Sequence, residues 1–287
     1  MSRPSALLPS PAVREAFARG ALHARSALGG RSYRRFVVVS VARTGSTLLT
    51  NLLNAQGQVL AFGELFRGDG AIGWDRWPFY SHQNARLRRL HETQPIAFLA
   101  TEVFRRWPRP IAAVGFKLFY YHARTGAQAQ VWDYLRADPA IAIIHLKRRN
   151  ILEQYVSLRV AHESNVWSTS SPRPPAEPIR LDPDACLRHF EEVRAQETQC
   201  ETFFGPGRMH SVDYEDLVAD RAGTMARIAA CLGVELGPLK AKIVRQRTQP
   251  LSAAIANYDE LREAFAGSPW EAFFHAADTA LAGQEAA

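Results

Sequence analysis

The sequence predicts an α/β protein with three layers, in which helices cover both faces of a central parallel sheet. Short runs rich in β-branched residues recur along the chain, and each has the continuous apolar character of a strand buried on both faces. Helical sequence separates each run from the next, which favours right-handed crossovers and therefore parallel strands. With 287 residues, 47% of them hydrophobic, the chain is long enough for one large domain over residues 36–287.

The first strand is predicted over residues 36–41, FVVVSV, and a turn of small polar residues follows it. The turn consists of Arg43, Thr44, Gly45, Ser46 and Thr47. The glycine lets the backbone turn closely, and the helix after it presents the free amides of its first turn beside the positive end of its dipole. Leu48 begins the face of this helix that packs on the sheet. A strand, turn and helix of this kind can bind phosphate.

This loop is shorter than the phosphate loop of nucleoside triphosphatases. Compared with the pattern GxxxxGK[ST], the leading glycine is absent and no lysine stands in register. Arg43 supplies a positive charge at the start of the turn. Taken alone, the segment is compatible with an anion site and equally with a turn that binds no ligand.

Three further strands are predicted, and two of them end near residues that can bind anions. The strands are expected over residues 111–118, 140–147 and 209–213, and a helix is expected over residues 127–137. Ligands of parallel sheets bind beyond the carboxyl ends of the strands. Lys117 and the basic run after the third strand are therefore expected on the same rim as the phosphate loop.

That basic run reads LKRRNILEQYVS over residues 146–157 and leads into a helix. Ser157 lies about two helical turns after Arg149, so a phosphate that contacts both side chains would lie along this helix and its entry. The alternative is that the cations are solvated and that the serine bonds to its own helix.

Positive charge is concentrated at the N-terminus. The net charge is +7, and residues 1–35, with seven Arg and one Glu, contribute +6 of it. The remaining residues hold 28 cations and 27 anions, so the folded body is not generally basic and no nucleic-acid partner is predicted. The N-terminal arm is expected to be flexible or to form a helix that lies on the domain or on an anionic membrane surface. Organellar transit peptides share its composition.

Three other features bear on the cellular compartment and on loops. No apolar span of about 18 residues or more is present, so no segment is expected to cross a membrane. Cys186, Cys200 and Cys231 are an odd number without metal-like spacing, which predicts reduced thiols in the cytoplasm. Residues 168–183 contain five prolines and predict a long surface loop of the kind that can act as a lid. The sequence leaves the oligomeric state open.

Taken together, the phosphate loop and the basic run resemble those of the sulfotransferases that use 3′-phosphoadenosine 5′-phosphosulfate. The turn at 43–47 looks like the family's 5′-phosphosulfate loop, and Arg149 with Ser157 reproduces its arginine-then-serine spacing for the 3′-phosphate. The resemblance covers residues 36–265 and implies the family's P-loop-like fold. Three segments are similar to the bacterial carbohydrate branch, which includes the nodulation-factor and trehalose 2-sulfotransferases. They are residues 115–124, 146–157 and 249–263.

The resemblance implies an enzyme that transfers a sulfuryl group from this donor to a hydroxyl of a carbohydrate or glycolipid, without a metal. It assigns the donor to Arg43, Thr44, Gly45, Ser46, Thr47, Leu48, Arg149 and Ser157. Arg43 and Lys117 would stabilise charge on the transferred group. The cytosolic branch of the family has a lysine in the place of Arg43 and a tryptophan in the place of Leu48, so adenine stacking by residue 48 is not expected here.

Glu64, in the sequence GELF, is the best candidate for the base that removes the proton of the acceptor. Bacterial carbohydrate members are similar in carrying a Gly-Glu pair whose glutamate serves as base. The alternative is a loop carboxylate that pairs with Arg67. His122 and His145 are weaker candidates, because a histidine within an apolar strand such as that of His145 is more often a hydrogen-bonded core residue.

Two further groups of residues have an acceptor-binding or donor-binding interpretation beside a structural one. The aromatic residues Trp74, Trp77, Phe79 and Tyr80 could stack on sugar faces or pack in the core. Arg245 and Arg247 could help to hold the 3′-phosphate or could be solvated.

Two other functions are compatible with the same motifs. One is a P-loop-like kinase that uses ATP and Mg²⁺, although the loop lysine and a clear acidic metal ligand are missing. The other is a non-catalytic module that binds anionic nucleotides or lipids, with the basic arm as its contact.

Overall fold

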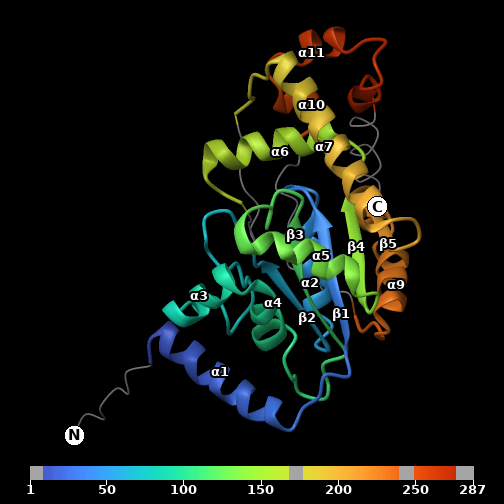
Figure 1. Ribbon diagram of the computed structural model, residues 1–287. Coiled ribbons are helices and arrows are strands. Elements are labelled where there is room, and N and C mark those ends of the chain that lie inside the picture. Colours follow the sequence, from blue (N-terminus) through green and yellow to red (C-terminus); the bar gives the residue numbers. More distant parts are fainter. Residues whose placement is uncertain (1–8, 168–176, 239–248, 276–287) are drawn as a thin grey trace, which may run out of the picture.

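The computed structural model of the protein describes residues 9–167, 177–238 and 249–275. Five parallel strands form a single sheet in the order β2-β3-β1-β4-β5 (Figure 1). The strands are β1 Arg34–Ser40, β2 Val59–Glu64, β3 Ala113–Phe119, β4 Ile141–Lys147 and β5 Met209–Asp213. The α-helices are α1 Pro11–Ala27, α2 Ser46–Asn54, α3 Ala85–Thr93, α4 Pro95–Phe98, α5 Gln130–Ala137, α6 Ile151–Ser164, α7 Pro183–Phe204, α8 Tyr214–Ala219, α9 Arg221–Leu232, α10 Leu251–Ala254 and α11 Tyr258–Ala264. A π-helical turn at Leu99–Val103 and a 3₁₀ turn at Gly126–Ala129 accompany them.

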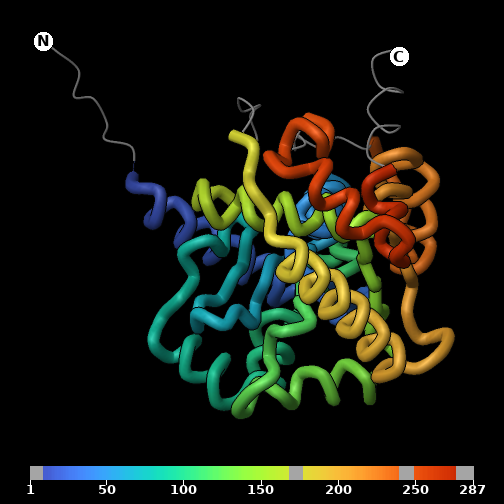
Figure 2. The backbone as a smooth tube through the Cα atoms, turned by 90° about the horizontal axis from the view of Figure 1, so that it is seen from above, coloured from blue at the N-terminus to red at the C-terminus, as the bar shows by residue number. Residues whose placement is uncertain are grey.

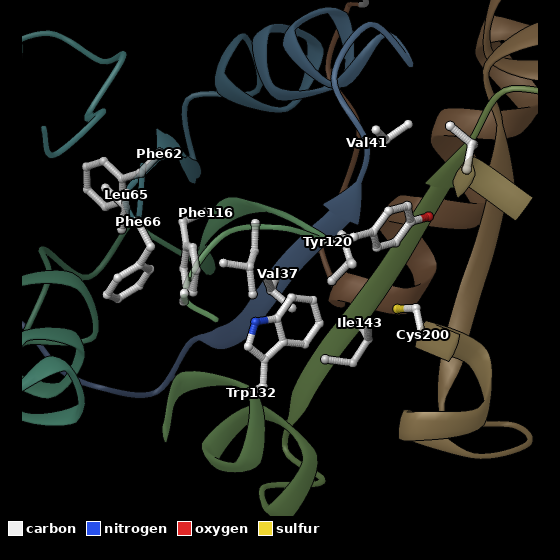
Figure 3. Packing of buried hydrophobic residues seen from close by; sticks show 14 of the residues in the cluster. Val37, Val41, Phe62, Leu65, Phe66, Phe116, Tyr120, Trp132, Ile143 and Cys200 are labelled. Carbon is white, nitrogen blue, oxygen red and sulfur yellow. The ribbon is translucent and has the colours of Figure 1, made fainter. Parts of the chain in front are cut away.

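Two clusters of buried hydrophobic side chains lie on the two faces of the sheet. In β1, Phe36 and Val38 belong to one cluster and Val37 to the other, because successive residues of a strand point to opposite faces. Helices α2, α8 and α9 cover the first face, and α3 to α7 cover the second, part of whose cluster is drawn in Figure 3. The three-layer α/β/α fold predicted from the sequence is therefore confirmed.

The four predicted strands correspond to β1, β3, β4 and β5, with ends that differ by at most two residues. Strand β2 was not predicted. Its apolar run, Val59 to Phe62, has only four residues and is followed by Gly63 and Glu64, so its sequence resembles a loop as much as a strand. It is nevertheless buried at the edge of the sheet, where it pairs with β3.

The N-terminal arm contains a helix, α1, which packs along the side of the domain (Figure 1). Glu15 accepts a hydrogen bond from the backbone N–H of Ser81 at 3.1 Å, and Arg19 donates to the carbonyl of Pro78 at 3.1 Å. These contacts join the helix to the segment that follows β2.

The C-terminal helices lie over the carboxyl ends of the strands, as the view from above shows (Figure 2). Phe190 of α7 contacts the rings of Phe265 and Phe273 at 5.4 and 5.3 Å between centroids. Asn150, at the start of α6, donates to the carbonyl of Phe273 at 2.8 Å. The end of the chain thereby fixes the entry of the helix that follows the basic run.

Candidate active site

A cavity of about 900 Å³ opens at the carboxyl ends of the strands. Its first wall is built by the turn after β1, the start of α2, the loop after β4, helix α6 with the segment after it, and the first residue of α8. We refer to this as the donor wall, because most of the residues that the resemblance assigned to the donor lie on it, and its main residues are Arg43, Gly45, Ser46, Thr47, Leu48, Arg148, Ser157, Trp167 and Tyr214. The opposite wall lies at the ends of β2 and β3, and we refer to it as the acceptor wall because it carries Glu64, the candidate base of the sequence analysis. Its main residues are Glu64, Arg67, Asp69, Asp75, Tyr80, Lys117, Tyr121 and His122.

The turn of the donor wall has two residues in the left-handed region, Arg43 with φ 68° and Gly45 with φ 84°. A Cβ atom at Gly45 would lie 2.4 Å from Cδ2 of Tyr214, so the absent side chain lets the tyrosine ring close over the turn. Thr44 points inward, and its hydroxyl donates to the carbonyl of Val41 at 2.8 Å. Its side chain does not line the cavity and instead holds the turn closed.

Helix α2 begins at Ser46 without a side-chain cap, because its N-cap residue is Gly45. Uncapped amides and the positive end of the helix dipole favour an anion at this position. Ser46, Thr47 and Leu48 line the cavity. Leu48 also packs against the hydrophobic cluster beneath α2, as predicted for the apolar face of this helix.

The two sequence segments assigned to the donor meet at Arg43. Its Nε donates to Oγ of Ser157 at 3.0 Å, and its guanidinium also donates to the carbonyl of Trp167. Burial, together with the nearby charge of Arg148, lowers the pKa of Arg43. Two guanidinium groups so close together repel each other, and an anion between them would relieve that repulsion.

Arg148 is the cation of the basic run that lines the cavity. It is 8% exposed, its guanidinium pairs with Glu153 and lies 4.6 Å from the centre of the Tyr214 ring. It also donates to the carbonyl of Arg43 at 3.2 Å. The sequence did not single out this residue.

Arg149, which the family spacing assigned to the 3′-phosphate, is not among the residues that line the cavity. Its guanidinium pairs with Asp216 at 2.7 Å and with Asp213 at 3.2 Å. Both arginines lie beyond the end of β4, where the chain bends at Arg149 before α6 begins, and their side chains reach different partners. The basic run itself carries no pattern that separates the two arginines.

Lys117 and Glu64 face each other on the acceptor wall. They are paired residues of β3 and β2, and β2 carries one extra residue between Ala61 and Glu64. A bulge of this kind turns the side chains beyond it to the other face of the sheet. As a result Nζ of Lys117, a side chain that is 2% exposed, lies 3.3 Å from Oε1 of Glu64 and 3.3 Å from Oγ1 of Thr47.

Asp75 is a third charged member of this group and was missed by the sequence analysis. Its Oδ2 lies 3.6 Å from Nζ of Lys117. The segment that carries it runs beside the end of β2, since Gly63 N–H donates to the carbonyl of Trp74 at 3.0 Å and Gly73 N–H to that of Glu64 at 3.1 Å. A Cβ at Gly63 would lie 2.1 Å from Oδ2 of Asp75, so only glycine leaves room for this carboxylate.

The two histidines considered as alternative bases lie in different places. His145 is buried in β4, where its Nε2 lies 2.6 Å from the hydroxyl of Tyr120, and burial lowers its pKa to about 4. His122 lines the cavity, and its Nδ1 accepts from the backbone N–H of Phe119 at 3.3 Å. Because this bond requires a lone pair on Nδ1, the proton is on Nε2 and the ring faces its surroundings as a donor. Burial lowers the pKa of His122 to about 4.

The aromatic residues after β2 divide between core and cavity. Trp74 and Phe79 are buried and contact the ring of Phe62 at 5.1 and 5.5 Å. Tyr80 is 56% exposed and lines the cavity, whereas Trp77 is exposed outside it. The core interpretation therefore holds for two of the four residues, and Tyr80 is the member that can contact a ligand.

Several sequence predictions lie outside the described residues. They include Arg245, Arg247 and residues 168–176 of the proline-rich loop predicted over 168–183. Within the described ranges, no three His, Cys, Asp or Glu side chains are grouped so that they could hold a metal ion, and no helix is long and apolar enough to span a bilayer. All three cysteines are free thiols, and Cys186 and Cys200 are buried.

Comparison with known proteins assigns the chain to a family. Residues 35–238 match the model of the sulfotransferase family. Nodulation protein H of Rhizobium tropici is 29% identical over 253 residues, which cover 85% of this chain and 94% of that protein. Nodulation protein H of Rhizobium meliloti strain 1021 is 27% identical over the same share of this chain and 96% of its own. A sulfotransferase structure from Alicyclobacillus acidocaldarius aligns with 88% of this chain and 95% of its own at a TM-score of 0.48 and 16% identity.

Proposed function

The chain belongs to the sulfotransferase family and is an enzyme that transfers a sulfuryl group, and we propose that it does so in the cytoplasm to a hydroxyl of a carbohydrate or glycolipid. The family implies 3′-phosphoadenosine 5′-phosphosulfate as the donor. The observation that carries the proposal is the position of Lys117, whose ammonium lies 3.3 Å both from Thr47 on the donor wall and from Glu64 on the acceptor wall.

The donor wall fits a nucleotide with two anionic ends. When bound, the donor supplies the sulfuryl group and leaves as adenosine 3′,5′-bisphosphate. The uncapped start of α2, with the hydroxyls of Ser46 and Thr47, suits the 5′-phosphosulfate. Arg43 and Ser157 are already hydrogen-bonded to each other and suit the anion that lies beside them. Arg149 would reach the 3′-phosphate only by exchanging Asp213 and Asp216 for it.

The acceptor wall fits a polyhydroxylated molecule. Carboxylates accept hydrogen bonds from hydroxyl groups, and the exposed rings of Tyr80 and Tyr121 can contact the faces of sugar rings. Glu64 would take the proton of the acceptor hydroxyl as the acceptor oxygen bonds to sulfur and the bond from sulfur to the donor's bridging oxygen breaks. Lys117 and Arg43 would stabilise the negative charge that develops on the oxygens.

A thermal-shift experiment tests the donor assignment. At a concentration of 100 times its Kd, adenosine 3′,5′-bisphosphate should stabilise the protein by about 2.7 kcal/mol, or roughly 5 °C in Tm. ATP with Mg²⁺ serves as the comparison ligand. Stabilisation by ATP with Mg²⁺ alone would contradict the assignment and favour a kinase.

The base is tested by replacing Glu64 with Gln, which keeps the shape of the side chain and removes its ability to accept a proton. The variant should bind adenosine 3′,5′-bisphosphate as the wild type does and should lose roughly 10²- to 10⁴-fold in turnover. Turnover is measured as transfer of labelled sulfate to a glycan and glycolipid extract. A fully active variant would rule out Glu64 as the base.

The membrane contact of the N-terminal arm is a separate part of the proposal, and the outer face of α1 supports it. Val13 and Phe17 are 42% and 75% exposed and lie about 40° of arc apart on the helix, with Arg14 and Arg25 beside them. Leu28, the residue that follows the helix, is 83% exposed. An apolar strip beside arginines suits an anionic lipid surface. Phe17→Ser should reduce co-sedimentation with vesicles containing phosphatidylglycerol but not change turnover on a water-soluble acceptor. Equal sedimentation of variant and wild type would refute this contact.

A further inference from the structure

Lys117 is held by two carboxylates rather than one, and the second has no role in the mechanism described so far. Its Nζ lies 3.3 Å from Glu64 and 3.6 Å from Asp75. Lys117 is 2% exposed, whereas Asp75 is 54% exposed. A cation that is so deeply buried requires a counter-charge, because a buried charge without a partner is strongly unfavourable.

The position of Asp75 is a built feature of the fold. It has a left-handed backbone with φ 46°, and two backbone hydrogen bonds tie its segment to the end of β2. The room for its carboxylate comes from Gly63, where a Cβ would lie 2.1 Å from Oδ2 and 2.3 Å from Cγ. A left-handed residue at such a site indicates that the surrounding structure holds the backbone in place.

On the acceptor wall, the neighbouring groups leave Lys117, Glu64 and Asp75 as the carriers of net charge. The other titratable or charged side chains of the acceptor wall are Arg67, Asp69, Tyr80, Tyr121 and His122. Arg67 and Asp69 pair with each other at 2.8 Å. Burial raises the pKa of Tyr121 and lowers that of His122 to about 4, so both are neutral near pH 7.

We propose that Asp75 is a positioning residue that keeps the Lys117 ammonium compensated while Glu64 takes up the proton of the acceptor. With Asp75 present, Lys117, Glu64 and Asp75 together carry a charge of −1 before proton uptake by Glu64 and zero after it. Without its charge they would go from zero to +1, and the positive charge would be on the buried lysine. Asp75 therefore makes proton uptake by Glu64 easier, and this inference rests on the proposed role of Glu64 as base.

Replacing Asp75 with Asn tests the proposal, because the substitution keeps the size of the side chain and removes its charge. The carboxylates of Glu64 and Asp75 lie within about 7 Å of each other, since both contact the same nitrogen. At that distance, and with Asp75 half exposed, loss of the charge should move the acid limb of the pH profile of kcat/KM to lower pH by roughly 0.5 to 1 unit. A weaker base should also lower the plateau of kcat by about two- to threefold.

Asp75→Glu is the matched control, because it keeps the charge at a side chain with room to extend toward solvent. It should return the acid limb to its wild-type position, and melting curves establish that each variant is folded. An acid limb that does not move in Asp75→Asn, together with an inactive Glu64→Gln, would refute the role of Asp75 alone. A fully active Glu64→Gln would refute the assigned base and with it this inference.

Discussion

Replacing Gly45 with Ala perturbs two features at once, the left-handed backbone of this residue and its close approach to Tyr214. Ala at φ 84° is strained, and a left-handed L-residue is disfavoured by about 1–2 kcal/mol. The new Cβ would lie 2.4 Å from the tyrosine ring, whereas ordinary contacts begin at 3.4 Å, so the ring must retreat by about 1 Å. Arg148 rests on that ring and would lose its position with it.

The expected effect on donor binding follows from these contacts. A guanidinium over an aromatic ring contributes about 0.5 to 2 kcal/mol. Because Arg148 lines the donor wall, loss of its support should weaken binding of adenosine 3′,5′-bisphosphate about 2- to 30-fold. The backbone strain is present in the free and the bound protein alike, so it should appear in the Tm and not in the affinity.

Gly57→Ala separates the two effects. Gly57 also has a left-handed backbone, with φ 68°, but a Cβ there meets no atom within 4 Å, and the residue does not line the cavity. This variant should lose stability as Gly45→Ala does and keep its affinity. Calorimetric titration with adenosine 3′,5′-bisphosphate measures both affinities. Equal affinity of the two variants would refute the argument that Tyr214 and the turn fix the donor site together.

Two further predictions concern the basic run and the pH dependence of stability. Arg149→Ala should weaken adenosine 3′,5′-bisphosphate binding by about 1.5 to 3 kcal/mol. If Arg149→Ala keeps the wild-type affinity and Arg148→Gln loses affinity, the 3′-phosphate contact belongs to Arg148 instead. Burial lowers the pKa of His145 to about 4 in the folded protein. Between that pH and 6.5, the unfolded chain therefore binds more protons than the folded protein does. The free energy of unfolding should fall as the pH drops below 6.5, by up to about 3 kcal/mol. Urea unfolding of wild type and His145→Gln at pH 7.5 and pH 5 measures this, and an equal pH dependence in both proteins would contradict it.

The strands and the phosphate turn could be predicted because their signals are local. The run at residues 36–41 is continuous and β-branched, and Gly45 follows it at the point where a buried strand must turn. The basic run over residues 146–157, in which Ser157 follows Arg149 by eight residues, is a local signal as well. Local patterns of this kind depend on neighbours along the chain, which the sequence shows directly.

The missing parts depend on contacts between distant segments. Asp75 joins the site only because β2 has a bulge before Glu64 and because Gly63 leaves room for a carboxylate. Tyr214 directly follows β5, which lies two strands away from β1, and it joins the site by closing over Gly45. Neither contact has a sequence pattern of its own. The glycines at 63 and 73, at the two ends of a ten-residue excursion, are the one hint that two backbones approach closely there.

The position of Lys117 gives these separate features a common consequence. Its ammonium is shared by the Thr47 hydroxyl, where the anionic donor would bind, and by Glu64, the proposed base. An anion at the start of α2 attracts the ammonium of Lys117. This attraction weakens the interaction between the ammonium and the carboxylate of Glu64. The carboxylate then becomes freer to accept a proton when the donor is present than when it is absent. Asp75 lowers the free-energy cost of moving the ammonium toward the anion. Its carboxylate remains paired with Lys117 whether the ammonium is nearer to the donor wall or to the acceptor wall.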